Sequence, residues 1–391
     1  MSNEQKTTVG AIGTKCDHNM LMNHIVASYM TTAKQPIMIH GGPGLGKSDI
    51  VRAAALQLSE ITGDEDFDVV DIRLLLLEPS DLRGLPFVTS ENECEWAIAP
   101  FLPKDPDSKG ILFLDELSAA SQQLMKAAYQ LVLDREIGEY RLPDGWLVVA
   151  AGNRLSDRGG VNVMPTPLKN RFLHCELDET AILGSWKDYA FNAGVHDAVI
   201  AYISFRPDAL YQFNTITNAF PTPRSWSFVS DTLRDLENFK PITSTSNQNT
   251  DLDVLREKII ASRIEGFVGA GVSSEFAAFL RVRDRLPSKA AILGGGSYNL
   301  DYTKTDIIWA VNTMLVSHFL GINKAKKSQK AGEVLAALEF IEKIPKLDLK
   351  AAAIRELNIQ GRLNVYLMHT NTPKEVKDKF TSIFNSLKSY M

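Results

Sequence analysis

Cysteine is scarce in this sequence, and long apolar runs are missing. The 391 residues include 3 cysteines, Cys16, Cys94 and Cys175, which lie far apart and show no paired spacing. This pattern indicates neither a disulfide framework nor a zinc knuckle, and we expect reduced thiols. No apolar run approaches the roughly 20 residues of a membrane-spanning helix. The N-terminus lacks the apolar segment of a secretory signal, so we expect a cytoplasmic protein without a membrane segment.

Charge of one sign is not in large excess either. Lysine and arginine number 42 and the acidic residues 47, which gives a formal net charge of −5. This balance disfavours a chain that coats nucleic acid, although a local basic pore inside an acidic total remains an alternative. The hydrophobic content of 45% and the length predict an ordinary globular protein of two or three domains.

Short apolar runs alternate with helical patterns in the first half of the chain. The runs predict β-strands at residues 36–40, 67–73, 110–114, 146–151 and 172–177. This alternation is typical of a mostly parallel sheet between layers of helices, so we expect an α/β core with a five-stranded sheet. Residues 84–98 and 135–146 predict two hairpins that project from that core.

Helical patterns replace the strands after about residue 178. They cover residues 180–193, 195–205, 224–238, 252–265, 273–284, 305–320, 330–344 and 373–388, with a polar loop at 243–250 and a glycine-rich linker at 294–297. We therefore expect an N-terminal tail (1–20), the α/β core (21–178), a helical lid (179–290) and a helical C-terminal extension (291–391).

Residues 41–48, with the sequence GGPGLGKS, satisfy the phosphate-loop pattern G-x-x-x-x-G-K-[ST] between a predicted strand and a predicted helix. The glycines let backbone N–H groups wrap a phosphate chain, and the start of the helix adds its positive end. Lys47 supplies a positive charge to the β and γ phosphates, and Ser48 offers a hydroxyl to magnesium. We predict that the nucleotide is bound by Gly41, Gly42, Pro43, Gly44, Leu45, Gly46, Lys47 and Ser48.

Polar side chains follow two later strands of the predicted sheet. Asp115 and Glu116 come directly after the apolar strand at 110–114, and Asn153 follows the strand at 146–151. Ligands of open α/β sheets bind at the carboxyl ends of the strands. We expect Asp115 to hold magnesium, Glu116 to polarise the attacking water, and Asn153 to orient that water. Taken alone, Asp115 and Glu116 could equally be a solvated strand end, and Asn153 could be a turn residue that caps its strand.

Two arginines complete the set of candidate catalytic residues. Arg171 lies just before the fifth predicted strand, where its guanidinium could reach the nucleotide of a neighbouring subunit and stabilise charge in the transition state. Arg224 lies near the first turn of a predicted helix in the second half of the chain.

In this order the motifs resemble those of the AAA+ ATPases: Walker A, Walker B ending in Asp-Glu, a sensor Asn, an arginine finger before Phe and a second sensor Arg. The two hairpins resemble the insertions of the MoxR-like, dynein-related branch. The sequence PTPRSW at 221–226 is similar to the S-P-R-T-W signature of some MoxR-like members, and residues 269–276 look like their lid. The resemblance covers residues 20 to 290.

This resemblance implies ATP and Mg²⁺ as cofactors and a ring, most often a hexamer, with nucleotide at the subunit interfaces. The arginine finger is then Arg171, and the second sensor is Arg224. In the MoxR-like family the ATPase typically works with a von Willebrand factor A (VWA) protein to mature or remodel a client complex. The competing expectations are a nucleic-acid motor such as a McrB-like restriction subunit and a scaffold whose nucleotide only holds a ring together.

The sequence departs from the family pattern at two places. Arg154 follows Asn153 where many MoxR-like members have proline, and Lys169 and Asn170 precede Arg171 where they have Leu-Asp. Residues 153–158 are also similar to the Asn-x-x-Asp-Arg segment of the GTP-dependent McrB-like motors, with one residue more. Arg154 or Arg158 is therefore a candidate for an extra phosphate contact, and GTP stays open beside ATP.

Overall fold

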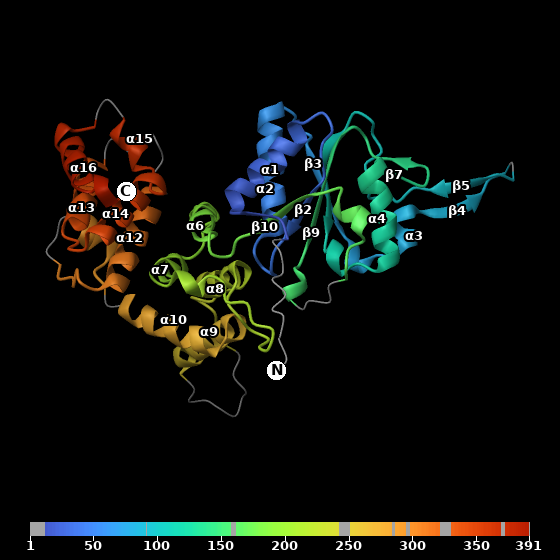
Figure 1. The fold of residues 1–391 in the computed structure, drawn as a ribbon. Helices are drawn as coiled ribbons and strands as arrows, with labels where there is room; N and C mark the ends of the chain where they lie inside the picture. The colour runs from blue at the N-terminus through green and yellow to red at the C-terminus, as the bar shows by residue number, and fades with distance from the viewer. Residues whose placement is uncertain are drawn as a thin grey trace, which may run out of the picture. The chain divides into compact units, whose positions relative to one another are not determined.

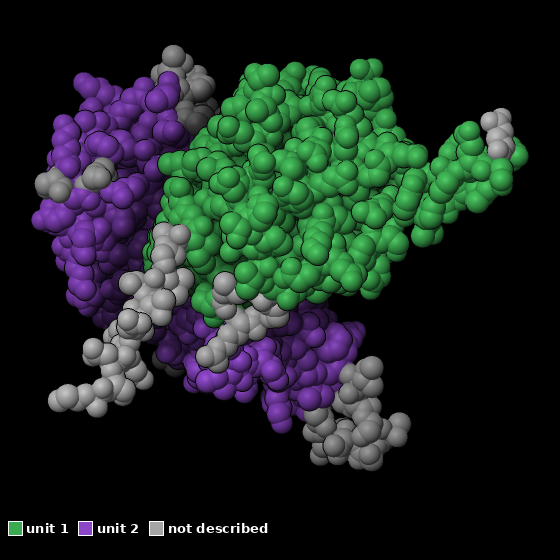
Figure 2. Space-filling model, turned by 45° about the vertical axis from the view of Figure 1, so that its right-hand side comes forward, with its two compact units in different colours: residues 1–185 green, residues 186–391 purple. Residues whose placement is uncertain are grey.

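The computed structural model describes residues 12–90, 92–157, 162–241, 251–283, 286–294, 298–320, 330–368 and 372–390. The chain divides into two compact units, Met1–Ser185 and Trp186–Met391 (Figure 2). The polar loop expected at 243–250 lies outside the described residues, as does the expected linker except Gly294. The further division of the second unit into a lid and an extension stays a prediction.

A six-stranded parallel sheet forms the centre of the first unit, which confirms the expected α/β fold class. In spatial order its strands are β1 (Thr14–Cys16), β10 (Leu173–Leu177), β2 (Ile37–His40), β9 (Gly145–Gly152), β6 (Lys109–Asp115) and β3 (Asp68–Arg73). All neighbouring pairs are parallel. The sixth strand, β1, lies within the expected N-terminal tail, and its three residues are too short to give a periodic signal.

Helices cover both faces of this sheet, which explains why its central strands are apolar at nearly every position. Figure 1 shows α1 (His18–Met30) and α2 (Lys47–Thr62) on one side and α4 (Gln122–Asp134) on the other. Helix α4 packs its buried Leu124, Ala128 and Leu131 against alternate strand residues. This helix was not among the predicted elements, although its apolar residues recur at helical spacing.

The two expected hairpins are present, but only one projects from the core. Strands β4 (Leu85–Val88) and β5 (Cys94–Ala97) pair antiparallel and extend away from the sheet (Figure 1). Strands β7 (Glu136–Ile137) and β8 (Tyr140–Arg141) instead pack on the core. Ile137 and Tyr140 are buried, and the Tyr140 hydroxyl donates to the Pro103 carbonyl at 2.8 Å. The expected projection of the second hairpin was therefore wrong.

The second unit is helical within its described residues. Its helices are α6 (Leu183–Asn192, which begins at the boundary), α7 (Asp197–Phe205), α8 (Pro223–Asp235), α9 (Leu252–Val268), α10 (Ala270–Arg283), α11 (Lys289–Leu293), α12 (Thr305–Leu320), α13 (Ala331–Glu342), α14 (Leu347–Ile359), α15 (Leu363–Leu367) and α16 (Lys374–Ser386). Helices α11, α14 and α15 were not predicted from the sequence. Among the described helices, none combines the length and the apolarity needed to cross a membrane.

Candidate nucleotide-binding site

The phosphate loop runs from the end of β2 to the start of α2 and adopts a conformation that requires glycine. Gly44 and Gly46 have φ angles of 76° and 83°, in the left-handed region where side chains other than glycine are strained. Leu45 is fully buried between them, and its carbonyl lies 2.9 Å from His18 Nε2. Burial lowers the pKa of His18. The loop is thus anchored by one apolar side chain and one neutral imidazole donor.

Lys47 lies at the centre of the loop and joins it to the neighbouring strand. Its ammonium donates to the carbonyls of Gly41 and Gly42 at 2.8 and 2.9 Å and to Asn153 Oδ1 at 3.1 Å. Strand β9 lies between β2 and β6, and its last residue, Gly152, is in register with His40. The sheet order therefore places Asn153 beside the predicted phosphate position, although the two motifs are far apart in sequence.

Ser48 and Asp115 meet at the same edge of the sheet. Ser48 Oγ lies 3.4 Å from Asp115 Oδ2, while Asp115 Oδ1 accepts from the Glu116 backbone N–H at 2.9 Å. A hydroxyl and a carboxylate are hard oxygen donors, which suit Mg²⁺ when phosphate oxygens and water complete an octahedron. The described residues contain no group of three or more His, Cys, Asp or Glu that could hold a metal. The donor set thus fits magnesium bound together with a nucleotide.

Glu116 turns the chain sharply at the end of β6. Its φ and ψ of 57° and 31° are left-handed values that a residue other than glycine adopts at a cost of about 1 kcal/mol or more. The carboxylate is half-buried and accepts no hydrogen bond from the described part of the chain. Asp115 and Glu116 are therefore adjacent in sequence but differ in their contacts, since only Asp115 lies against Ser48.

The two predicted arginines are both exposed, and each lies in a different unit. Arg171 follows α5 (Thr166–Lys169), and its side chain forms no ion pair with any described residue. Arg224 lies in the first turn of α8, which Thr222 and Ser225 cap reciprocally. Because the units are described separately, the role of Arg224 at the phosphate loop stays a prediction.

Arg154, a candidate for an extra phosphate contact, is surrounded by carboxylates. Its guanidinium lies 3.2 Å from Asp157 and 3.4 Å from Glu176, and it also pairs with Glu179. Its side chain is mostly buried. This network gives Arg154 a structural partner set in the first unit, so the hypothesis of a phosphate contact gains no support. Arg158, the other candidate, lies outside the described residues.

A histidine pair beside the loop was missed by the sequence analysis. His40 Nε2 lies 2.8 Å from His174 Nδ1, and His174 Nε2 lies 2.7 Å from the Lys169 carbonyl. Since a carbonyl only accepts, His174 donates from Nε2, and in this tautomer its Nδ1 accepts from His40 Nε2. Burial, followed by the charges of His174 and Lys47, lowers the pKa of His40 to about 4. The pair joins the strand before the phosphate loop to the segment that ends in Arg171.

Comparisons with known proteins add partial likenesses. No protein-family model matches this chain. It is similar to Midasin of Giardia intestinalis, with 32% identity over 154 residues, which is 37% of this chain and 3% of that protein. A RuvB variant from Thermotoga maritima has 16% identity and a TM-score of 0.38, covering 74% of this chain and 79% of its own. NtrX from Brucella abortus in complex with ADP has 15% identity and a TM-score of 0.36, covering 88% of this chain and 68% of its own. Both TM-scores lie below 0.5, so these two likenesses carry nothing about activity.

Proposed function

We propose that this chain is an AAA+ ATPase of the MoxR-like branch, which hydrolyses ATP in a hexameric ring to remodel or mature a client protein complex with a VWA-domain partner. The observation that carries the proposal is the meeting of three motifs at one sheet edge. Strands β2, β9 and β6 lie side by side and bring Lys47 to Asn153 and Ser48 to Asp115. A phosphate loop alone would only bind a nucleotide, and the added carboxylates supply the means to cleave it.

Each residue of the edge has a distinct part in the proposed hydrolysis. The loop N–H groups and Lys47 bind the β and γ phosphates, and Ser48 and Asp115 would hold Mg²⁺. Magnesium, when bound, neutralises charge that develops on the phosphates. Glu116 polarises the attacking water, and Asn153, which already accepts from Lys47, orients it near the γ phosphate.

Arg171 is the residue that makes the proposed activity depend on a neighbour. Its side chain is exposed and unpaired among the described residues, as expected for a group that acts on the nucleotide of the next subunit. The finger then stabilises transition-state charge only when a ring has formed. We expect a separated subunit to bind ATP but to hydrolyse it poorly.

The projecting hairpin favours a protein client over a nucleic acid. Leu85, Phe87 and Val88 are exposed on β4, and the exposed Glu93 and Glu95 follow at the tip and on β5. Nucleic-acid backbones are bound by lysine and arginine, so this surface suits an apolar protein segment better than a phosphate chain. The McrB-like alternative therefore ranks second.

Mixing two inactive variants tests the proposal directly. We expect Arg171→Ala and Glu116→Gln each to bind ATP yet lose most turnover. In a one-to-one mixture, a subunit with intact Glu116 can receive the finger of a neighbour with intact Arg171, so activity recovers to roughly a quarter of the wild-type rate at random assembly. Lys126→Ala, an exposed change on α4, serves as the control. Full activity of Arg171→Ala alone, or no recovery in mixtures that do assemble, would contradict the finger.

The partner is tested by affinity capture from native lysate with Glu116→Gln, which should hold ATP and the complex together. Recovery of a VWA-domain protein together with a metabolic or metal enzyme would support the remodelling role. Recovery of a nuclease or DNA would instead favour the restriction-type motor. Wild-type protein captured in parallel shows which partners depend on arrested hydrolysis.

A further inference from the structure

The second unit contains a cavity of about 610 Å³ whose lining is rich in arginine. Its walls come from α6, α7, α8, α10, α12 and the residue before α15, which are far apart in sequence. This volume lies in the range of small-molecule sites. The lining that matters here consists of Arg234, Arg283, Arg362, His196, Phe191 and Val195.

Positive charge exceeds negative charge around this cavity. Three arginines line it, and the only lining carboxylate among the described residues, Asp197, accepts a hydrogen bond from Ser317 Oγ at 2.7 Å. Arg234 pairs with Asp231 at 2.9 Å, but both side chains are about half exposed, so this pair neutralises it weakly. Arg283 is partly buried and forms no ion pair within the described residues. Among its described lining residues the cavity therefore has more guanidinium groups than carboxylates.

Helix dipoles explain why Arg234 and Arg283 lie where they do, but they do not explain why these residues converge. Each lies in the last turn of its helix, α8 or α10, where a cation is favoured. A cation at a helix end can point to solvent at no cost. Here both line one concave space, and Arg283 does so without an ion pair among the described residues, so a bound anion would offset its charge.

His196 adds a neutral hydrogen-bond donor to the same wall. Burial lowers the pKa of His196, and the positive charges of Arg283 and Arg234 lower it further, while the carboxylates of Asp197 and Glu237 oppose them. The ring is therefore neutral near pH 7. Its Nδ1 accepts from the Ala198 backbone N–H at 3.2 Å, which leaves the hydrogen on Nε2.

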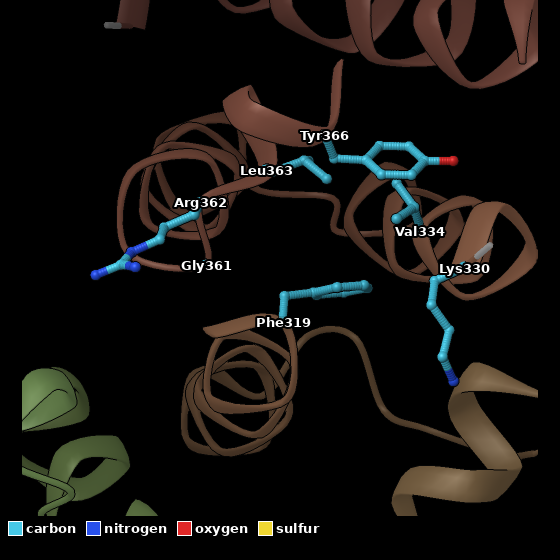
Figure 3. A pocket seen from close by; sticks show the side chains of 7 residues that line it. All are labelled: Phe319, Lys330, Val334, Gly361, Arg362, Leu363 and Tyr366. Carbon is cyan, nitrogen blue, oxygen red and sulfur yellow. The ribbon is translucent and has the colours of Figure 1, made fainter. Parts of the chain in front are cut away.

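Arg362 reaches this cavity through a strained backbone. Its φ of 53° is a left-handed value at the start of α15, which costs a residue other than glycine about 1 kcal/mol or more. Figure 3 shows its side chain pointing away from the apolar side chains of Phe319, Leu363 and Tyr366. The backbone turn thus separates the guanidinium from the neighbouring apolar pocket. Strain of this kind concentrates at functional sites.

We propose that this cavity binds a phosphate-bearing small molecule, with Arg234, Arg283 and Arg362 on the phosphate groups. The planar guanidinium matches two phosphate oxygens at once, and a phosphate group offers enough oxygens for several such pairs. The buried Phe191 and Val195 provide an apolar wall for an organic part. The site is independent of the phosphate loop and does not rest on the proposed ATPase function.

The test uses the full-length chain with Lys47→Ala, which silences the phosphate loop, and isothermal titration with pyrophosphate. We expect saturable binding that weakens at least tenfold when Arg283→Ala is added. Arg281→Ala, on an exposed position of the same helix that does not line the cavity, should leave the affinity unchanged. No saturable binding, or equal effects of Arg283→Ala and Arg281→Ala, would overturn the proposal.

A second arm distinguishes the source of the phosphate. ATP titrated into the Lys47→Ala chain should compete with pyrophosphate if the natural ligand is a nucleotide. If pyrophosphate instead binds more tightly than ATP, the natural ligand is a free polyanion.

Circular dichroism checks that Arg283→Ala is folded. If it is not, Arg283→Gln and Arg234→Gln give the same comparison with the side-chain length kept, and a loss of affinity in neither would count against the site.

Discussion

The phosphate loop of the first unit and the arginine-lined cavity of the second unit are built in opposite ways. The loop is one contiguous stretch, residues 41–48, in which, under the proposed function, backbone N–H groups supply most of the phosphate recognition and Lys47 supplies the charge. The cavity draws Arg234, Arg283 and Arg362 from three separate segments. A binding site made of backbone geometry leaves a motif in the sequence, whereas one made of dispersed side chains does not.

Arginine itself shows the same contrast. Arg154 in the first unit is mostly buried against three carboxylates, while Arg283 in the second unit lines a cavity without an ion pair among the described residues. The sequence shows two arginines that look equivalent. Only their surroundings indicate that one stabilises the fold and the other is available to an anion.

The largest effect on stability is expected where arginine has a structural role. Arg154→Gln leaves Asp157 and Glu176 buried without their cation, and we expect the free energy of unfolding to fall by about 3 to 5 kcal/mol. Arg52→Gln removes only exposed ion pairs and should cost less than about 1 kcal/mol. Urea unfolding of both variants measures the difference. Similar losses in the two variants would show that the buried network has no special weight.

The independence of the two proposed anion sites is tested by Lys47→Ala. Removal of this ammonium takes away the point charge of the loop, and we expect nucleotide affinity at the first unit to fall by about 100-fold or more. Pyrophosphate binding in the second unit should stay unchanged. Titrations of the single variant and of Lys126→Ala measure both. Loss of all phosphate binding in Lys47→Ala would show that the second unit does not bind phosphate independently of the loop.

The histidine pair gives the first unit a pH dependence with a defined sign. The pKa of His40 is about 4 in the folded chain against 6.5 ordinarily, so the unfolded chain takes up the proton first. The free energy of unfolding therefore has its full value above pH 6.5, and it falls by roughly 2 to 3 kcal/mol as the pH drops toward 4. We expect the free energy of unfolding, measured against pH, to change less between pH 6.5 and 4 in His40→Gln than in His24→Gln. The same pH dependence of the free energy of unfolding in both variants would contradict a lowered pKa of the buried His40.

The smallest effect is expected at the projecting hairpin, where the local pattern resembles that of the packed hairpin. Val88 on β4 is 70% exposed and Ile137 on β7 is 1% exposed. Val88→Ser should change the free energy of unfolding by less than about 0.5 kcal/mol, whereas Ile137→Ser should cost several times as much. Thermal unfolding compares the two. A large loss for Val88→Ser would mean that the first hairpin is packed after all.

Most of the first unit could be predicted because its signals are local. Strands β2, β6 and β9 are mostly apolar runs, β3 and β10 hold shorter ones, and the loop pattern fixes the start of α2 at Lys47. Strand β1 escaped because three residues carry no periodicity. The burial of Tyr140 was not predicted either, because it depends on a contact with Pro103, which the sequence alone does not place beside it.

The sequence by itself determined the α/β class, the phosphate loop and the residue types at its edge, because each depends on neighbours within a few positions. Only the tertiary structure decided which distant groups meet: Lys47 with Asn153, His40 with His174, and the arginines around the second cavity. The physical reason is the range of the forces involved. Backbone conformation is set by adjacent residues, whereas charge and hydrogen bonding act between side chains that only the packed sheet and helices bring together.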